Sequence, residues 1–236
     1  MSTFVLVHGA FHGGWCWHKI VARLEARGHT VFAPDMPGHG IDRTPIGDVT
    51  MADIVAKMAA VIDAAKEPVV LAGHSYGGAV ITETAEARPD KIRKLVFLTA
   101  YMVPNGEITM TVAQSDTGND MAGNIAFAED GKTATALPAG ARNLFYGQCA
   151  DDDVALARLL LVPEATAGFQ VPIRTTAERY GRIPRVYIEC LKDRAISIGL
   201  QRKFHVANPC EVFTLDTDHS PFFSTPDELT GILAGL

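Results

Sequence analysis

Five residues in the first third of the chain have the spacing of a turn that carries a nucleophile. Residues 73–77 read Gly-His-Ser-Tyr-Gly; they follow an apolar run at 69–72 and precede a helix-like stretch that begins at Gly77. A serine in such a strand–turn–helix is held in a strained backbone conformation and points out of the sheet edge. Glycines are needed two residues either side, because side chains there would collide with the adjoining strand and helix. Ser75 is therefore the candidate nucleophile.

One histidine in the second half of the chain is expected to act as the general base for this serine. A serine hydroxyl is a poor nucleophile until a histidine, usually oriented by a carboxylate, takes its proton. The expected chain order on this sheet is serine, acid, histidine. Of the eight histidines, only His205 and His219 come late enough, and His219 follows the last expected strand. His219 is the candidate base, and His205 is expected in or near the preceding helix.

Acidic residues near the ends of the last two expected strands are candidates for the orienting carboxylate. Asp193 follows the fifth expected strand and is predicted to face His219. Glu189 and Asp218 are the fallback candidates. Asp216 and Asp218 are closer to His219 in sequence, and we expect them to shape its turn.

A glycine-rich stretch at 8–14, directly after the first strand, predicts a site for negative charge. A tetrahedral intermediate needs backbone N–H donors, and losing one donor costs about 3 to 4 kcal/mol. Tyr76, after the nucleophile, offers one N–H group, and Ala10 is the best candidate for the second. His8 and His12 have the spacing of a metal pair, but that spacing suits a helix face rather than a loop. We expect these two histidines to hold the loop by hydrogen bonds.

The elements that must position these residues alternate between short apolar runs and helical stretches. This alternation is typical of βαβ units on a parallel sheet flanked by helices, an α/β fold. The strands are expected at 3–7, 30–33, 68–72, 92–98, 185–190 and 211–215. The helices are expected at 15–27, at 51–65 with a capping box formed by Thr50 and Asp53, and from Gly77 to before Pro89. Ligands bind at the edge where the carboxyl ends of such strands meet.

The segment 103–183 breaks this alternation and predicts a cap inserted into a core made of 1–102 and 184–236. The segment is rich in Gly, Ala, Asp and Thr, with one clear helix near 152–161 and a loop-like stretch at 114–140. Aromatic side chains in and near the cap are suited to an apolar pocket. The candidate substrate contacts are Phe11, His12, Phe145 and Phe222.

Composition describes an ordinary globular chain. Its 236 residues suit one domain with a full core, with 47% hydrophobic residues, 20% charged residues and a mean hydropathy near zero. No apolar run approaches the ~20 residues of a membrane span, and the net charge of −6 has no Lys/Arg block suited to nucleic acid. No secretory signal is visible, so a cytoplasmic location is expected. Widely spaced cysteines predict isolated buried thiols, at Cys16, Cys149, Cys190 and Cys210.

Several of these stretches resemble the α/β-hydrolase superfamily, and within it the branch of plant methylesterases, hydroxynitrile lyases and bacterial esterase relatives. They are HGAFHGGWCW at 8–17, GHSYGG at 73–78, Lys192-Asp193 and Asp218-His219. The resemblance implies an α/β-hydrolase fold of about six strands with an inserted cap and no cofactor or metal. It also implies Ser75, Asp193 and His219 as nucleophile, acid and base, with Ala10 and Tyr76 as the oxyanion hole. Close relatives in this branch often pair, which implies that a homodimer can form.

The same resemblance separates hydrolysis from cyanohydrin cleavage. Lyases of this branch have a threonine directly after the first-strand histidine and a lysine directly after the catalytic histidine, whereas this chain has Gly9 and Ser220. The prediction is therefore a serine carboxylesterase acting on small to medium apolar or aromatic esters. The alternatives are a hydroxynitrile lyase, or a lactone or amide hydrolase, on the same fold, and a non-enzymatic small-molecule receptor.

Overall fold

The computed structural model describes all 236 residues, and its core is a six-stranded sheet in which every neighbouring pair of strands is parallel. The order across the sheet is β2-β1-β3-β4-β8-β9. The strands are β1 (Thr3–Val7), β2 (Thr30–Phe32), β3 (Val69–His74), β4 (Ile92–Leu98), β8 (Arg185–Cys190) and β9 (Glu211–Leu215). The predicted parallel sheet is confirmed, although β3 continues two residues further than expected, up to the serine turn.

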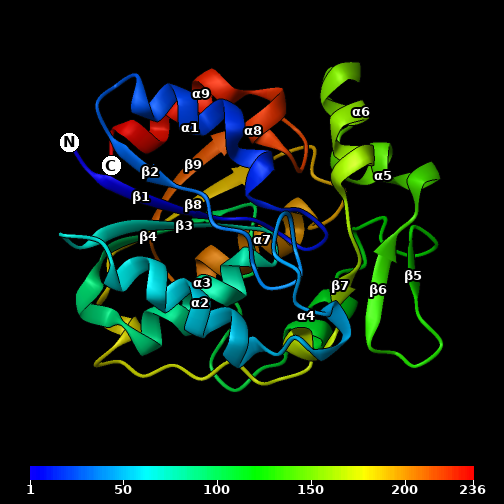
Figure 1. Ribbon diagram of the computed structural model, residues 1–236, viewed down its shortest axis with the longest axis horizontal. Helices are drawn as coiled ribbons and strands as arrows, with labels where there is room; N and C mark the ends of the chain where they lie inside the picture. The colour runs from blue at the N-terminus through cyan, green and yellow to red at the C-terminus, as the bar shows by residue number, and fades with distance from the viewer.

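Helices cover both faces of this sheet (Figure 1). On one face lie α2 (Met51–Asp63) and α3 (Gly77–Ala87), and on the other lie α1 (His18–Glu25), α8 (Pro221–Ser224) and α9 (Pro226–Ala234). The side chains of α7 (Ile198–Ala207) join the same apolar layer as those of α2 and α3. Successive strand residues alternate between the two layers, so the central strands are apolar on both sides.

The start of α2 agrees with the prediction from the sequence, whereas the start of α1 differs from it. Thr50 and Asp53 form the predicted capping box at the start of α2. The helix expected at 15–27 is instead a 3-10 turn, Gly14–Trp17, followed by the shorter α1. A Cβ atom at Gly14 would lie 2.1 Å from the Ala33 carbonyl oxygen, so the chain enters this helix closely packed against the end of β2.

The segment between β4 and β8 holds a small antiparallel sheet and three α-helices, seen to the right of and below the main sheet in Figure 1. The sheet consists of β5 (Ile125–Phe127), β6 (Thr133–Ala136) and β7 (Glu164–Ala165), and the helices are α4 (Thr109–Gln114), α5 (Pro138–Phe145) and α6 (Asp151–Leu160). The predicted helix near 152–161 is confirmed as α6. The stretch 114–140, expected to be loop-like, is only partly so: between α4 and α5 it is irregular apart from β5 and β6, which pair with each other, and β6 pairs in turn with the distant β7.

Direct contacts fasten this segment to the core. Leu144 and Val154 share one apolar layer with the helices on the α1 face. The Lys19 ammonium lies 2.7 Å from the Asp153 carboxylate, and Asp218 accepts a hydrogen bond of 2.6 Å from the Gln148 N–H. The segment therefore packs as part of the same body, and its boundaries at 103 and 183 stay a prediction.

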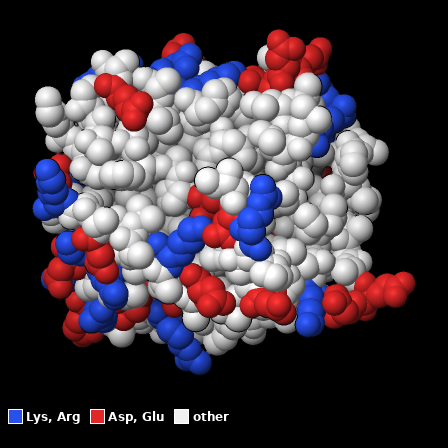
Figure 2. Space-filling view, viewed as in Figure 1, with Lys and Arg blue, Asp and Glu red and all other residues white.

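The outer surface carries mixed charge. Figure 2 shows Lys and Arg side chains interspersed with Asp and Glu, without a continuous basic area on this face. No helix combines the length and the apolar composition needed to cross a membrane. All four cysteines are free, and all are buried except Cys210, which is partly exposed.

Candidate active site

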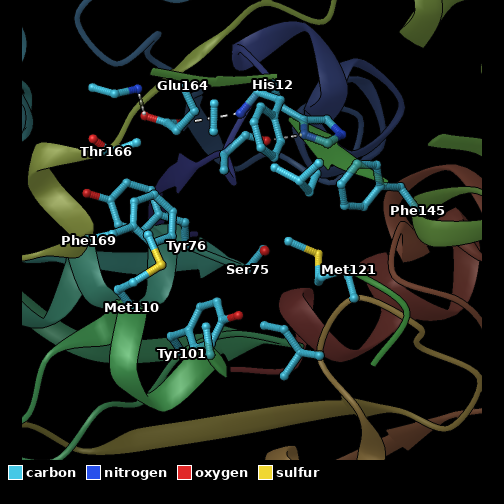
Figure 3. A pocket seen from close by; sticks show the side chains of 18 of the residues that line it. His12, Ser75, Tyr76, Tyr101, Met110, Met121, Phe145, Glu164, Thr166 and Phe169 are labelled. Carbon is cyan, nitrogen blue, oxygen red and sulfur yellow. Dashed lines mark hydrogen bonds between the residues drawn. The ribbon is translucent and has the colours of Figure 1, made fainter. Parts of the chain in front are cut away.

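A largely apolar cavity, with about 690 Å³ of empty space when the part open to solvent is included, lies where the carboxyl ends of the strands meet the inserted segment. Ser75 lies in the middle of this cavity in Figure 3, surrounded by aromatic and methionine side chains. The apolar part of the lining includes Phe11, Tyr101, Met110, Met121, Phe145 and Phe169. The polar part includes His12, Ser75, Glu164, Thr166 and His219. The cavity therefore joins residues from both ends of the chain.

Ser75 occupies the strained turn that the sequence predicts. It connects β3 to α3 with a φ of +54°, a left-handed value that is uncommon outside glycine. A Cβ atom at Gly73 would lie 2.4 Å from the Gly77 carbonyl oxygen, and one at Gly77 would lie 2.8 Å from the His8 carbonyl oxygen. Both glycines are thus required by close packing of the helix start against β1 and β3. The Ser75 hydroxyl makes no hydrogen bond within the protein.

His219 lies in the same cavity wall and is held by Asp193. The His219 Nδ1 atom is 2.7 Å from Asp193 Oδ2, and both side chains are buried. Because a carboxylate only accepts hydrogen bonds, Nδ1 carries the proton and Nε2 is left with a free lone pair. Nε2 makes no hydrogen bond within the protein, so it can accept a proton from a group in the cavity.

Asp193 is oriented by four donors besides His219. The Ala195 and Ile196 N–H groups donate to its Oδ1 atom at 2.7 and 3.0 Å, and the Thr99 hydroxyl donates to Oδ2. The Gln201 side chain adds a longer contact of 3.5 Å to Oδ2. Such a set of donors stabilises the ionised carboxylate and fixes its plane.

The two fallback carboxylates are engaged elsewhere. Glu189 contacts Arg202 and His205, at 3.1 Å in both cases, in a polar cluster on α7 and β9. Asp218 accepts hydrogen bonds from the Ser220 N–H and the Gln148 N–H, so it shapes the turn next to His219, as expected. The structure brings Asp193, and neither alternative, to the candidate base.

The two candidate oxyanion donors, Ala10 and Tyr76, both line the cavity. Neither of their backbone N–H groups donates to an acceptor within the protein. Ala10 lies in the loop that follows β1, here called the β1 loop (residues 8–14). The next residue, Phe11, has a φ of +68° and is one of three left-handed non-glycine residues in the chain. Two free N–H groups beside Ser75 can stabilise a negative oxygen.

His8 and His12 hold the β1 loop by hydrogen bonds, as expected. His8 donates from Nδ1 to the Gly9 carbonyl at 2.8 Å and accepts at Nε2 from the Met36 N–H at 3.0 Å. His12 donates from Nδ1 to the Ala10 carbonyl at 2.8 Å, and its Nε2 accepts from the Tyr146 hydroxyl at 2.7 Å. All four ring nitrogens are therefore used within the protein. Burial lowers the pKa of His12 to about 4 and keeps the ring neutral.

Three of the four predicted substrate contacts line the cavity, namely Phe11, His12 and Phe145. The prediction for Phe222 is wrong. Its ring is fully buried outside the cavity, with its centroid 5.3 Å from that of Trp17 and 5.0 Å from that of His74. The short helix α8 turns this side chain into the apolar layer on the α1 face, away from the serine.

Sequence reasoning missed four polar residues around the site. His74 donates from Nε2 to the His219 carbonyl at 2.7 Å and so fixes the backbone of the candidate base. Thr99 follows β4 at the same edge as Asp193, so its position could have been found from the strand ends. Glu164 and His39 pair at 3.1 Å across 125 residues of sequence, and no local pattern signals that contact.

The fold and this site define the class of protein, and comparison with known proteins gives the family. The six-stranded parallel sheet, the serine turn and the inserted segment are those of an α/β-hydrolase. The profile described as "Alpha/beta hydrolase family" matches residues 4–231, so the chain belongs to that family, in its methylesterase branch.

The relatives come from plants and bacteria. Putative methylesterase 14 of Arabidopsis thaliana is 35% identical over 249 residues, which cover 99% of this chain and 71% of the relative. The pyrethroid hydrolase of Sphingobium wenxiniae is 31% identical, covering 99% and 87%. The crystal structure of an Arabidopsis methylesterase matches with a TM-score of 0.86 at 30% identity, covering 99% and 97%. Some matching methylesterases are longer, and the chain spans 56% to 63% of three of them. These relatives support a hydrolase that cleaves esters.

Proposed function

We propose that the protein is a serine carboxylesterase that uses Ser75, His219 and Asp193. The observation that carries this proposal is one cavity in which Ser75, at a φ of +54°, shares the wall with a histidine held 2.7 Å from a buried carboxylate. A further support is the pair of unpartnered N–H groups at Ala10 and Tyr76. These parts supply a nucleophile, a base and a site for negative charge.

The proposed reaction has two halves. His219 Nε2 takes the Ser75 hydroxyl proton while Oγ bonds to the ester carbonyl carbon, and Ala10 and Tyr76 stabilise the oxyanion. The ester C–O bond then breaks, and His219 gives its proton to the leaving alcohol. A water molecule, deprotonated by His219, attacks the carbonyl carbon of the acyl-enzyme. The bond from this carbon to Ser75 Oγ then breaks, His219 returns its proton to Oγ, and the carboxylic acid leaves. Asp193 stays ionised and stabilises the imidazolium. The chemistry needs no cofactor.

The proposed substrate is a neutral ester with small to medium apolar or aromatic groups. The cavity wall is mostly apolar, and its charged residue, Glu164, is already engaged in hydrogen bonds to the protein. A charged group on the substrate would therefore lose its hydration without gaining a partner. Relatives named methylesterase and pyrethroid hydrolase support an ester as the substrate.

Two positions favour ester hydrolysis over cyanohydrin cleavage. A Cβ atom at Gly9 would lie 2.8 Å from Ser75 Cβ and 2.9 Å from His74 Nδ1, so a threonine there would need the turn to move. Ser220, where the lyases have a lysine, is fully buried, and its hydroxyl makes no hydrogen bond. The chain thus lacks both groups that would bind and release cyanide.

A labelling experiment tests the proposal. A fluorophosphonate probe should modify the native protein at Ser75, and Ser75→Ala should abolish both labelling and turnover of p-nitrophenyl acetate with an unchanged circular dichroism spectrum. Ser2→Ala, a serine change far from the cavity, should leave both intact. Retained turnover in Ser75→Ala would contradict the proposal. Benzaldehyde released from mandelonitrile above the spontaneous rate would favour the lyase instead, and tight ligand binding without turnover would favour a receptor.

A further inference from the structure

A second buried carboxylate, Glu164, lies in the cavity wall beside the β1 loop. It belongs to β7 of the inserted segment and is only 1% exposed. Its Oε2 atom accepts hydrogen bonds from the Phe11 N–H at 3.2 Å and from His39 Nε2 at 3.1 Å. Figure 3 shows Glu164 and His12 along the same wall above Ser75, with Tyr101 below it. The inserted segment thus reaches the loop that carries Ala10.

The geometry of His39 indicates that this contact is an ion pair. His39 Nδ1 lies 3.1 Å from the Pro37 carbonyl oxygen, which only accepts, and Nε2 faces the Glu164 carboxylate. Both ring nitrogens therefore carry protons, and the imidazolium balances the charge of Glu164. The balance matters because a bare carboxylate in this wall would oppose negative charge on a reacting oxygen.

Two peptide groups flank the Ala10 Cα atom in the β1 loop. Of their two N–H and two carbonyl groups, all but one form hydrogen bonds within the protein. The Gly9 carbonyl accepts from His8, the Ala10 carbonyl accepts from His12, and the Phe11 N–H donates to Glu164. The Phe11 carbonyl accepts from the Val162 N–H at 3.0 Å, so the inserted segment holds Phe11 on both sides. The Ala10 N–H makes no hydrogen bond within the protein, and the hydrogen-bonded groups on both sides of it fix its direction.

We propose that the Glu164–His39 pair is a positioning device for the Ala10 oxyanion donor. Glu164 holds Phe11 in its left-handed conformation, with a φ of +68° that is unfavourable for a bulky residue, and His39 neutralises the carboxylate. The inserted segment therefore helps to build the oxyanion hole as well as the pocket. This inference rests on the proposed esterase function.

The test separates binding of an oxyanion from binding of a neutral ligand. A trifluoromethyl ketone adds to a catalytic serine and places a negative oxygen in the oxyanion hole, whereas the matching methyl ketone binds mainly as a neutral ligand. Glu164→Ala should lower kcat by about 10- to 100-fold, less than the roughly 10²- to 10³-fold loss when a donor is removed outright. Its affinity for the trifluoromethyl ketone should fall in parallel, while KM and the methyl ketone affinity change by less than about 3-fold.

Two further variants complete the experiment. Glu164→Gln keeps an acceptor for the Phe11 N–H, so it should recover part of kcat and of the trifluoromethyl ketone affinity. Asp120→Asn is the control, because it removes an exposed contact between the inserted segment and Arg194 without touching the β1 loop. It should behave as wild type. If Glu164→Ala does not fold, the trifluoromethyl ketone affinity of Glu164→Gln decides the question in the same way.

The outcomes are distinct from those for the esterase proposal. An unchanged kcat in the Glu164 variants, or an equal loss of affinity for both ketones, would overturn the positioning role. That result would leave the esterase intact as long as the fluorophosphonate still labels Ser75 in the native protein. Loss of labelling specificity in the native protein, by contrast, would remove the esterase proposal itself.

Discussion

Two buried carboxylate–histidine pairs lie at the same cavity, and they differ in what the second ring nitrogen does. In the pair of Asp193 and His219, the atoms are 2.7 Å apart and His219 Nε2 is free. In the pair of Glu164 and His39, they are 3.1 Å apart and the other nitrogen of His39 is bonded to the Pro37 carbonyl. The first histidine can therefore exchange a proton with a ligand, whereas the second is committed to structure.

The pairs also differ in where their carboxylates come from. Asp193 follows a core strand and is surrounded by donors from its own loop, from Thr99 and from α7. Glu164 comes from the inserted segment and depends on a contact with a distant loop. A buried histidine beside a carboxylate is thus not by itself evidence of catalysis. A free second nitrogen facing a cavity is the property that distinguishes the candidate base.

Among the residues that support a histidine without reacting themselves, the largest expected effect comes from changing the carboxylate of the first pair. Asp193→Asn keeps the shape but supplies an amide that can donate to His219, which favours the tautomer with its proton on Nε2. We expect kcat for p-nitrophenyl acetate to fall by about 10⁴-fold, with little change in the melting temperature. The matched change Glu164→Gln should lower kcat far less. Equal losses in the two variants would contradict the distinction between the pairs.

Acid should lower the contribution to the free energy of unfolding of a buried histidine that has no carboxylate partner, which is the opposite of what we expect for His39. Burial lowers the pKa of His12 to about 4, so between about pH 6.5 and 4 the unfolded chain binds a proton that the folded chain does not. The free energy of unfolding should therefore fall by about 3 kcal/mol from this residue as the pH drops through that range. Urea denaturation at about pH 7 and about pH 4 measures the loss, which His12→Asn should reduce.

For His39, burial disfavours the charge, but hydrogen bonding and the charge of Glu164 outweigh it and raise the pKa. The stabilisation from this pair is fully present below the pKa that His39 has in the unfolded chain. It is lost as the pH rises through the raised value, so protonation of this imidazole by acid does not remove it. Neighbouring Asp35 favours the same charged form, and the neutral ring of His8 lies beside it.

A smaller effect is expected from Thr99, which donates to Asp193. Thr99→Val removes a hydrogen bond to a buried charge while keeping the side-chain shape, and it should lower the free energy of unfolding by about 1.5 to 3 kcal/mol. Turnover should fall much less than in Asp193→Asn, because the bond from His219 remains. Urea denaturation and steady-state kinetics on one preparation check both statements. A loss of turnover as large as that of Asp193→Asn would show that Thr99 does more than orient the carboxylate.

The smallest effect concerns the second histidine. His39→Gln can still donate to Glu164 but carries no charge, so the carboxylate is retained without its counter-charge. We expect kcat to fall by about 10-fold, with the same loss of trifluoromethyl ketone affinity and little change in KM. The corresponding change His219→Gln should abolish turnover. Similar residual activity in these two variants would contradict the assignment of His219 as the base and of His39 as a structural residue.

The chain sequence was sufficient for the core and for three of the residues that follow its strands. Ser75 comes directly after β3, Asp193 and His219 come shortly after the ends of β8 and β9, and parallel strands bring their carboxyl ends to one edge. The inserted segment was harder to predict. Its strands have two to four residues, and the small sheet is completed by pairing between residues as far apart as Thr133 and Ala165, so the stretch at 114–140 looked like a loop.

The sequence by itself thus determined the parallel sheet, the strained serine turn and the order of the chemical groups, because glycine spacing and apolar runs act locally. The tertiary structure alone decided three things. It excluded Glu189 and Asp218 as partners of His219, it moved Phe222 out of the cavity, and it joined Glu164 to His39 beside the β1 loop. Each depends on side chains that meet across long stretches of sequence, where only packing and charge balance in the folded chain choose the partner.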